Sequence, residues 1–135
     1  MNIKIDGLKV LIVDDEERNR KLLGDLVKFN GDQVIYAAHG QEALEILMNE
    51  HVDVMLLDLI MPIIDGIQVM KILKRKKLLS FLSVIIISAI TDTETRTIAF
   101  DNGAFGIIHK PIVKQELFEV LNEIRYSKLK TEKKA

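Results

Sequence analysis

The sequence has no cysteine, and this absence removes several classes of site at once. Without a thiol the chain has no disulfide, no iron–sulfur cluster, no thiolate zinc site and no thiol nucleophile, and it is compatible with a reducing cytosol. Long apolar runs are absent too: runs such as Val84-Ile85-Ile86-Ile87 are far shorter than the ~20 residues that span a bilayer. Asp6 interrupts the first residues before any apolar core develops, unlike in a signal peptide. We therefore expect a cytoplasmic protein without a membrane-spanning segment.

The chain also lacks an excess of charge of either sign. It carries 19 Lys and Arg against 20 Asp and Glu, a formal net charge of −1, so no overall field attracts nucleic acid or an anionic membrane. Its 135 residues suit one domain. We assign residues 1–127 to that domain and residues 128–135 to a basic C-terminal tail or the start of a linker.

Short apolar runs alternate with segments of helical periodicity. Because the runs are continuously apolar, they predict strands covered on both faces, as in a parallel sheet. A helix is predicted after each strand: Thr91-Asp92-Thr93-Glu94 matches a capping box, and the last helix covers about 113–126. The alternation predicts a doubly wound α/β fold, a flavodoxin-like five-stranded parallel sheet in the order 2-1-3-4-5 with helices on both faces. The predicted strands occupy residues 9–13, 33–37, 52–57, 83–88 and 106–109.

Polar residues stand at the ends of four predicted strands. Asp14 and Asp15 follow the first strand, and Asp58 follows the third. Ser88 ends the fourth strand, and Lys110 follows the fifth. In such sheets ligands bind at the carboxyl ends of the strands, beside the switch point between the first and third strands. We therefore expect these five residues to form one site.

The charges of this cluster predict a metal site. Three carboxylates within a few ångströms repel one another, so they take up protons or a cation. An all-oxygen site suits Mg²⁺, with Mn²⁺ as an alternative. The cation draws in a phosphoryl group, to which Lys110 adds a positive charge and Ser88 a hydroxyl donor. Asp58 lies centrally and is the best-placed carboxylate to act as a nucleophile and form an acyl phosphate.

These residues resemble the receiver domain of two-component response regulators, over about residues 8–126. The resemblance implies that Asp58 is phosphorylated by a histidine of a sensor kinase or of a histidine phosphotransfer protein. It also implies that Mg²⁺ is held by Asp15, Asp58 and the backbone carbonyl of Ile60, with Asp14 acting directly or through water. The motifs that carry it are Val10 to Glu16, Leu57 to Pro62 with Asp65-Gly66, Ile87-Ser88-Ala89, Gly103-Ala104 and Lys110-Pro111.

The resemblance also implies a conformational switch. Ser88 would move toward the phosphoryl group, Lys110 would pair with it, and the bond between Lys110 and Pro111 would be cis. The face made by the fourth helix, fifth strand and fifth helix would shift and signal to a downstream output domain or protein, and a phosphorylation-dependent homodimer stays open. One position departs from the family: Ile107 stands where a tyrosine or phenylalanine is usual, and Phe105 lies two residues earlier.

Other readings of the same residues remain. A receiver-like interaction module that works without phosphate is supported only by Ile107. A magnesium-dependent phosphohydrolase usually carries a second acid two residues after its nucleophile, where this chain has Ile60, so a turnover enzyme is disfavoured. Asp14 and Asp15 could also merely cap the first helix. Finally, the bulk of Ile60 and Ile90 predicts a slow hydrolysis of the phosphorylated state.

Overall fold

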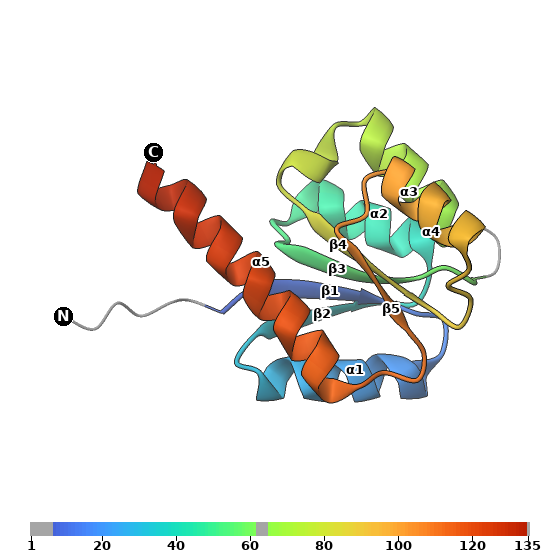
Figure 1. The fold of residues 1–135 in the computed structure, drawn as a ribbon, viewed down its shortest axis with the longest axis horizontal. Helices are drawn as coiled ribbons and strands as arrows, with labels where there is room; N and C mark the ends of the chain where they lie inside the picture. The colour runs from blue at the N-terminus through green and yellow to red at the C-terminus, as the bar shows by residue number, and fades with distance from the viewer. Residues whose placement is uncertain (1–6, 62–64, 135) are drawn as a thin grey trace.

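The computed structural model describes residues 7–61 and 65–134, and its centre is one parallel sheet (Figure 1). The sheet has five strands in the order β2-β1-β3-β4-β5, which confirms the predicted topology. Adjacent strands pair in parallel register, with Val13 opposite Ala37 on one side and opposite Leu57 on the other. The strands are β1 (Lys9–Val13), β2 (Gln33–Ala37), β3 (Val54–Asp58), β4 (Ser83–Ser88) and β5 (Gly106–His109).

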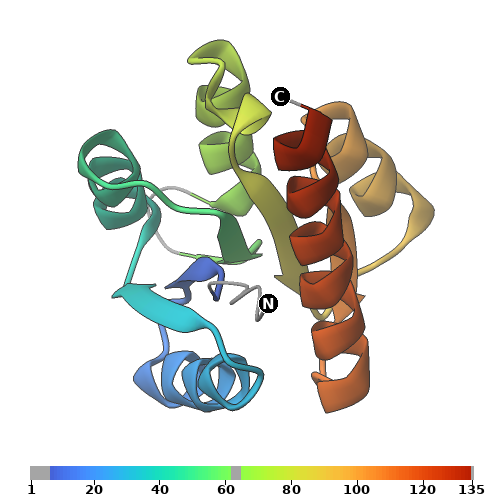
Figure 2. The same cartoon turned by 90° about the vertical axis from the view of Figure 1, so that its left-hand side faces the viewer.

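Helices cover both faces of the sheet, as predicted (Figures 1 and 2). Helices α1 and α5 pack on one face, and α2, α3 and α4 pack on the other. A short 3₁₀ helix, η1, lies between α3 and β4 and was not predicted. The bounds are α1 (Glu17–Phe29), α2 (Gly40–Asn49), α3 (Gly66–Arg75), η1 (Leu78–Ser80), α4 (Thr93–Asp101) and α5 (Lys114–Lys134).

Each strand supplies apolar side chains to both of the cores that these layers enclose. In β1, Val10 and Ile12 point to the α1–α5 side, whereas Leu11 and Val13 point to the other side. All four side chains are at most 1% exposed. This two-sided burial explains why the strands are continuously apolar rather than alternating. The carboxyl ends of the buried strands then form one edge, on which the candidate site lies.

The C-terminal helix is longer than predicted. It continues to Lys134 instead of ending near residue 126. Contacts beyond Ile124 explain the extension: Arg125 pairs with Asp32, and Lys128 donates to the backbone oxygen of Phe81. Figure 1 shows the last turns of α5 reaching past the sheet. A division between a domain and a linker at residue 128 stays a prediction.

The start of one helix also differs from the sequence prediction. Helix α4 is capped by Asp92, whose carboxylate accepts from the backbone N–H of Thr95, so the expected Thr91 cap is one residue early. A capping box is found instead at α3, where the side chains and backbone N–H groups of Asp65 and Gln68 bond reciprocally. Within the described residues, no helix combines the length and apolar character needed to cross a bilayer.

Candidate functional site

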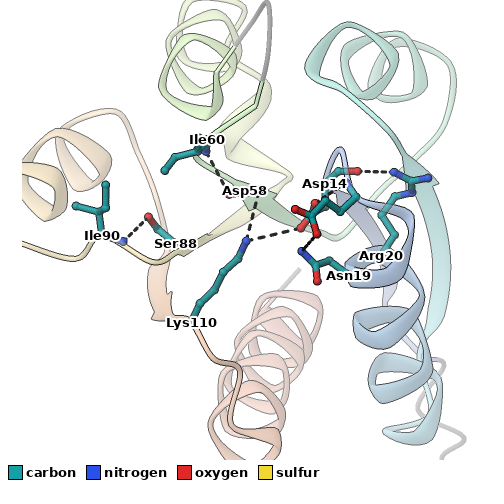
Figure 3. Close-up of polar contacts among 9 residues, drawn as sticks. Asp14, Asn19, Arg20, Asp58, Ile60, Ser88, Ile90 and Lys110 are labelled. Carbon is teal, nitrogen blue, oxygen red and sulfur yellow. Dashed lines mark hydrogen bonds and ion pairs between the residues drawn. The ribbon is translucent and has the colours of Figure 1, made fainter.

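Three carboxylates converge at the carboxyl edge of the sheet. Asp14 and Asp15 follow β1, and Asp58 ends the neighbouring strand β3. One carboxylate oxygen of each lies within 4.8 Å of the others, so the structure brings together the three acids that were predicted from the sequence. Figure 3 shows two of them, Asp14 and Asp58. Asp14 is 1% exposed and Asp58 7%, whereas Asp15 faces solvent. The cluster is therefore buried on the sheet side and open to solvent at Asp15.

Backbone groups and one arginine fix the orientation of Asp14. Its N–H donates to the Ala37 oxygen at 3.2 Å, which extends the β1–β2 pairing by one residue. Its Oδ1 accepts from the N–H of Glu16 at 2.9 Å, and its backbone oxygen accepts from Arg20 Nη1 at 2.6 Å. The other carboxylate oxygen, Oδ2, lies 3.9 Å from Lys110 Nζ. Asp14 is thus held on three sides while Oδ2 faces the cluster.

Asp58 has two neighbours that donate to it. Oδ1 accepts from the N–H of Ile60 at 3.2 Å, and Oδ2 accepts from Lys110 Nζ at 3.4 Å. Burial is the main influence on its pKa and raises it, and the charge of Asp14 raises it further. The Ile60 N–H and the Lys110 charge lower the pKa but do not outweigh burial, so it stays above its ordinary value. The protein alone therefore does not fully compensate this carboxylate.

Ser88 and Lys110 lie together because β4 and β5 end side by side. The N–H of Lys110 donates to the Ser88 backbone oxygen at 2.9 Å, and the peptide bond to Pro111 is cis, as the resemblance implied. The Ser88 side chain is buried, and its Oγ accepts from the N–H of Ile90 at 3.0 Å. Figure 3 shows Ser88 and Lys110 on the same side of the site. A contact of Ser88 with a phosphoryl group stays a prediction.

The donor set fits a hard divalent cation. Asp14, Asp15 and Asp58 offer only carboxylate oxygens, which is the ligand chemistry of Mg²⁺ and similar ions. Lys110 pairs with only two of the three carboxylates, those of Asp14 and Asp58, so a bound cation would offset the repulsion that remains. Helix capping does not explain the acids. The N-cap of α1 is Glu16, and its side chain makes no capping bond. The Asp14 carboxylate accepts from the N–H of Glu16, which precedes the first residue of the helix.

Apolar residues stand at the positions that the sequence singled out. The side chains of Ile60 and Ile90 are 61% and 49% exposed. Ile107 is half-buried, pairs with Ile86 across β4 and β5, and packs against the core on the α2–α4 side. Phe105 precedes β5 and is 39% exposed. Ile107 is therefore a packing residue in this structure, and no aromatic ring occupies its position.

Sequence reasoning missed Arg20. Its side chain reaches back from the first turns of α1 to the Asp14 carbonyl. The sequence did contain a signal for this contact: Arg20 is a long side chain with hydrogen-bond donors, and its position early in the predicted helix lets it reach the loop before that helix. The sequence alone does not reveal which carbonyl it meets.

Comparison with known proteins decides the family. A family model described as "Response regulator receiver domain" matches residues 10–122. The chain belongs to this family. It is therefore a phosphoacceptor domain of two-component signalling and not a classical turnover enzyme. Receiver domains bind Mg²⁺ at an acidic cluster of the kind formed here, and they interact with histidine kinases and output domains.

Relatives and solved structures agree with this assignment. "Probable transcriptional regulator ycf27" of Porphyridium aerugineum is 37% identical over 109 residues, covering 81% of this chain and 44% of the relative. "Transcriptional regulatory protein SrrA" of Staphylococcus aureus is 36% identical with the same coverage. The receiver domain spans less than half the length of these relatives.

Among solved structures, the receiver domain of the Francisella response regulator 1452 superposes with a TM-score of 0.84 at 30% identity, covering 90% of this chain and 99% of that one. The chemotaxis response regulator CheY4 of Vibrio cholerae has a TM-score of 0.80 at 27% identity, covering 87% and 98%. The receiver domain therefore matches almost the whole of each of these solved chains.

Proposed function

We propose that Asp58 is the phosphoacceptor of this receiver domain and that Asp14, Asp15, Asp58 and the Ile60 backbone carbonyl hold Mg²⁺, with Mn²⁺ as a substitute. The observation that carries the proposal is the convergence of three carboxylates, two of which, those of Asp14 and Asp58, pair with a single lysine. Bound Mg²⁺ would neutralise the carboxylates and attract phosphoryl oxygens. The domain would act in the cytoplasm, a compartment compatible with its lack of cysteine.

The reaction is a transfer between two side chains. A carboxylate oxygen of Asp58 attacks the phosphorus of a phosphohistidine, an O–P bond forms, and the N–P bond breaks with its electron pair returning to the imidazole. Lys110, now 3.4 Å from Asp58 Oδ2, offsets charge on the transferred group. The donor is a sensor histidine kinase or a histidine phosphotransfer protein.

The switch follows from the contacts that phosphorylation changes. Lys110 exchanges its ion pair with Asp58 for one with the phosphoryl oxygens, and the Ser88 hydroxyl rotates to donate to the same group. Because both residues stand where β4 and β5 end, their movement biases α4, β5 and α5. A shift from 1:99 to 99:1 requires about 5.5 kcal/mol of differential stabilisation. With Ile107 in β5, this shift proceeds without rotation of a ring at that position.

The output side of the proposal is a partner rather than a ligand. The shifted α4–β5–α5 face would signal to an output domain or a separate protein, or would pair with a second phosphorylated copy. Binding of nucleic acid or membrane by this domain is not part of the proposal, because the net charge is only −1.

Phosphorylation can be tested by intact-protein mass spectrometry after incubation with acetyl phosphate and Mg²⁺. We expect a single adduct of about 80 Da, the mass of one phosphoryl group, that EDTA prevents. Asp58→Asn should abolish the adduct because an amide is not a nucleophile here. Asp53→Asn is the matched control, because Asp53 directly precedes β3 whereas Asp58 ends it. This variant should be labelled like the wild type.

Two other outcomes identify the alternatives. A folded wild-type chain that binds Mg²⁺ but acquires no adduct would favour an interaction module that works without phosphate. Steady release of phosphate from small phosphoesters would instead indicate a phosphohydrolase. Equal labelling of the Asp58→Asn variant would contradict the assigned nucleophile.

A further inference from the structure

The backbone carbonyl of Asp14 belongs to the peptide unit that joins Asp14 to Asp15. Peptide units are planar and rigid, so the direction of this carbonyl also sets how the chain leaves each of the two residues. Asp14 lies one residue beyond the end of β1 and is 1% exposed. A buried carbonyl at this point needs a donor, and it is not supplied by helix α1, which begins only at Glu17.

Arg20 supplies that donor from outside the strand. Its Nη1 lies 2.6 Å from the Asp14 oxygen, a short charge-assisted hydrogen bond (Figure 3). The backbone N–H of Arg20 donates to the Glu16 oxygen at 3.0 Å, so the same residue closes the first turn of α1. The start of α1 and the Asp14–Asp15 peptide are thereby tied to one half-buried side chain.

We infer that Arg20 is a positioning residue for the metal site: it orients the peptide from which the carboxylates of Asp14 and Asp15 both extend. This inference rests on the proposed function of those carboxylates. Groups that orient metal ligands without touching the metal typically change its affinity 10- to 100-fold when they are removed. Arg20 would therefore act on Mg²⁺ affinity rather than on the transfer step.

The sign of the effect separates positioning from simple charge. Removing a positive charge beside three carboxylates would by itself strengthen binding of a cation, because a repulsive interaction is lost. Loss of orientation acts in the opposite direction. Weaker Mg²⁺ binding after neutralisation of Arg20 therefore reports positioning, whereas tighter binding reports charge alone.

The test is calorimetric titration of Mg²⁺ into the full chain as wild type, Arg20→Met, Arg20→Lys and Arg18→Met. We expect Arg20→Met to bind Mg²⁺ about tenfold more weakly. Arg20→Lys keeps a donor and the charge and should recover most of that loss. Arg18 is exposed on the same helix, so Arg18→Met is the matched control for a lost charge and should stay within about twofold of the wild type.

A second readout is the rate of labelling by acetyl phosphate at increasing Mg²⁺. For Arg20→Met, the half-saturating Mg²⁺ concentration should rise about tenfold while the rate at saturation stays within about twofold of the wild type. Equal or tighter Mg²⁺ binding by Arg20→Met overturns the inference, as does a lower saturated rate at an unchanged half-saturating concentration.

Folding and function are controlled separately. Urea unfolding in EDTA shows whether each variant is folded. If Arg20→Met is not folded, Arg20→Gln replaces it, because this substitution removes the charge and shortens the reach to the carbonyl. Arg20→Gln should also bind Mg²⁺ more weakly, and equal or tighter binding overturns the inference. A wild type that binds Mg²⁺ and is labelled, with variants that match it, refutes only the role of Arg20. A wild type that does neither refutes the proposed function as well.

Discussion

The two ends of the sheet treat their acidic residues differently. At the amino end, the Asp32 side chain is fully buried and accepts hydrogen bonds from Nη1 and Nη2 of Arg125, at 2.7 and 3.0 Å. Its Oδ1 also accepts from the N–H of Leu8 at 2.9 Å. At the carboxyl end, Asp14 and Asp58 share Lys110 at 3.9 and 3.4 Å.

A second acid at the amino end has a similar set of partners. Asp53 accepts from the N–H of Lys9 at 2.8 Å, contacts His51 Nε2 at 2.9 Å, and pairs with Lys128 Nζ at 3.4 Å. The amino end therefore uses its acids to join loops and α5. At the carboxyl end, the acids carry more negative charge than the neighbouring cations of the protein offset. This excess of negative charge distinguishes a binding site for a cation from a structural ion pair.

The largest effect is expected where an acid of the amino end loses its charge. Asp32→Asn leaves the Arg125 guanidinium, which is 14% exposed, without its counter-charge, and we expect the free energy of unfolding to fall by about 3 kcal/mol. Urea denaturation in EDTA measures this change. Asp25→Asn, an exposed acid of α1, is the control for net charge and should alter stability by less than about 0.5 kcal/mol. A loss below about 1 kcal/mol for Asp32→Asn would show that this pair is not structural.

The same substitution at the carboxyl end should have the opposite sign. Burial and the charge of Asp14 raise the pKa of Asp58, so its charged form disfavours the folded state. Asp58→Asn should therefore stabilise the metal-free protein by about 1 kcal/mol at neutral pH. Urea denaturation with and without Mg²⁺ measures both the gain and the expected loss of stabilisation by Mg²⁺. Destabilisation in EDTA would mean that Asp58 is compensated like the acids of the amino end.

Exposed apolar residues extend the comparison to kinetics. The N–H of Ile60 donates to Asp58 and that of Ile90 donates to Ser88, and we expect the bulk of both side chains to hinder the water that hydrolyses the acyl phosphate. Ile60→Asn or Ile90→Glu should speed loss of the phosphoryl group about fivefold, which corresponds to ~1 kcal/mol of activation free energy. The rate is measured by mass spectrometry, as the loss of the adduct of about 80 Da, one phosphoryl group, after the donor is removed. Phe81→Asn changes a 70% exposed side chain at the opposite end, and its rate should match the wild type.

The smallest effect concerns acid pH. Burial raises the pKa of Asp53, but the Lys9 N–H, His51 and Lys128 together lower it below its ordinary value of 3.8. Because the folded pKa is the lower one, Asp53 stabilises the fold above about pH 4, and this stabilisation is lost as the pH falls through the folded value. The free energy of unfolding, measured with urea, should therefore fall less steeply for Asp53→Asn than for the wild type between pH 5 and pH 2.5, roughly the window in which such carboxylates titrate. Parallel pH profiles for the two proteins would rule out this contribution.

Sequence patterns predicted most of the fold for a local reason. A strand that is buried on both faces needs a continuous apolar run, and each such run was visible without the structure. The order of the strands followed from the handedness of their connections. The acids and the lysine of the candidate site were visible because they stand where those runs end, and parallel strands bring their ends together.

Helix ends were less predictable, because several capping residues compete over a few positions. Thr91 and Asp92 both suit an N-cap, and only the backbone geometry selects Asp92. The end of α5 depends on partners far away in the chain. Arg125 lies 93 residues from Asp32, and Lys128 lies 47 residues from Phe81, so no local pattern announces either contact.

The sequence by itself determined which segments form strands and helices, which residues stand at the carboxyl edge, and the chemistry that three carboxylates, a hydroxyl and an ammonium share. The tertiary structure decided which acids form a candidate cation site and which acid pairs with an arginine. It also decided that Arg20 meets the Asp14 carbonyl. The physical reason is that apolar periodicity acts along the chain, whereas the pairing of a charge depends on distances that only packing establishes.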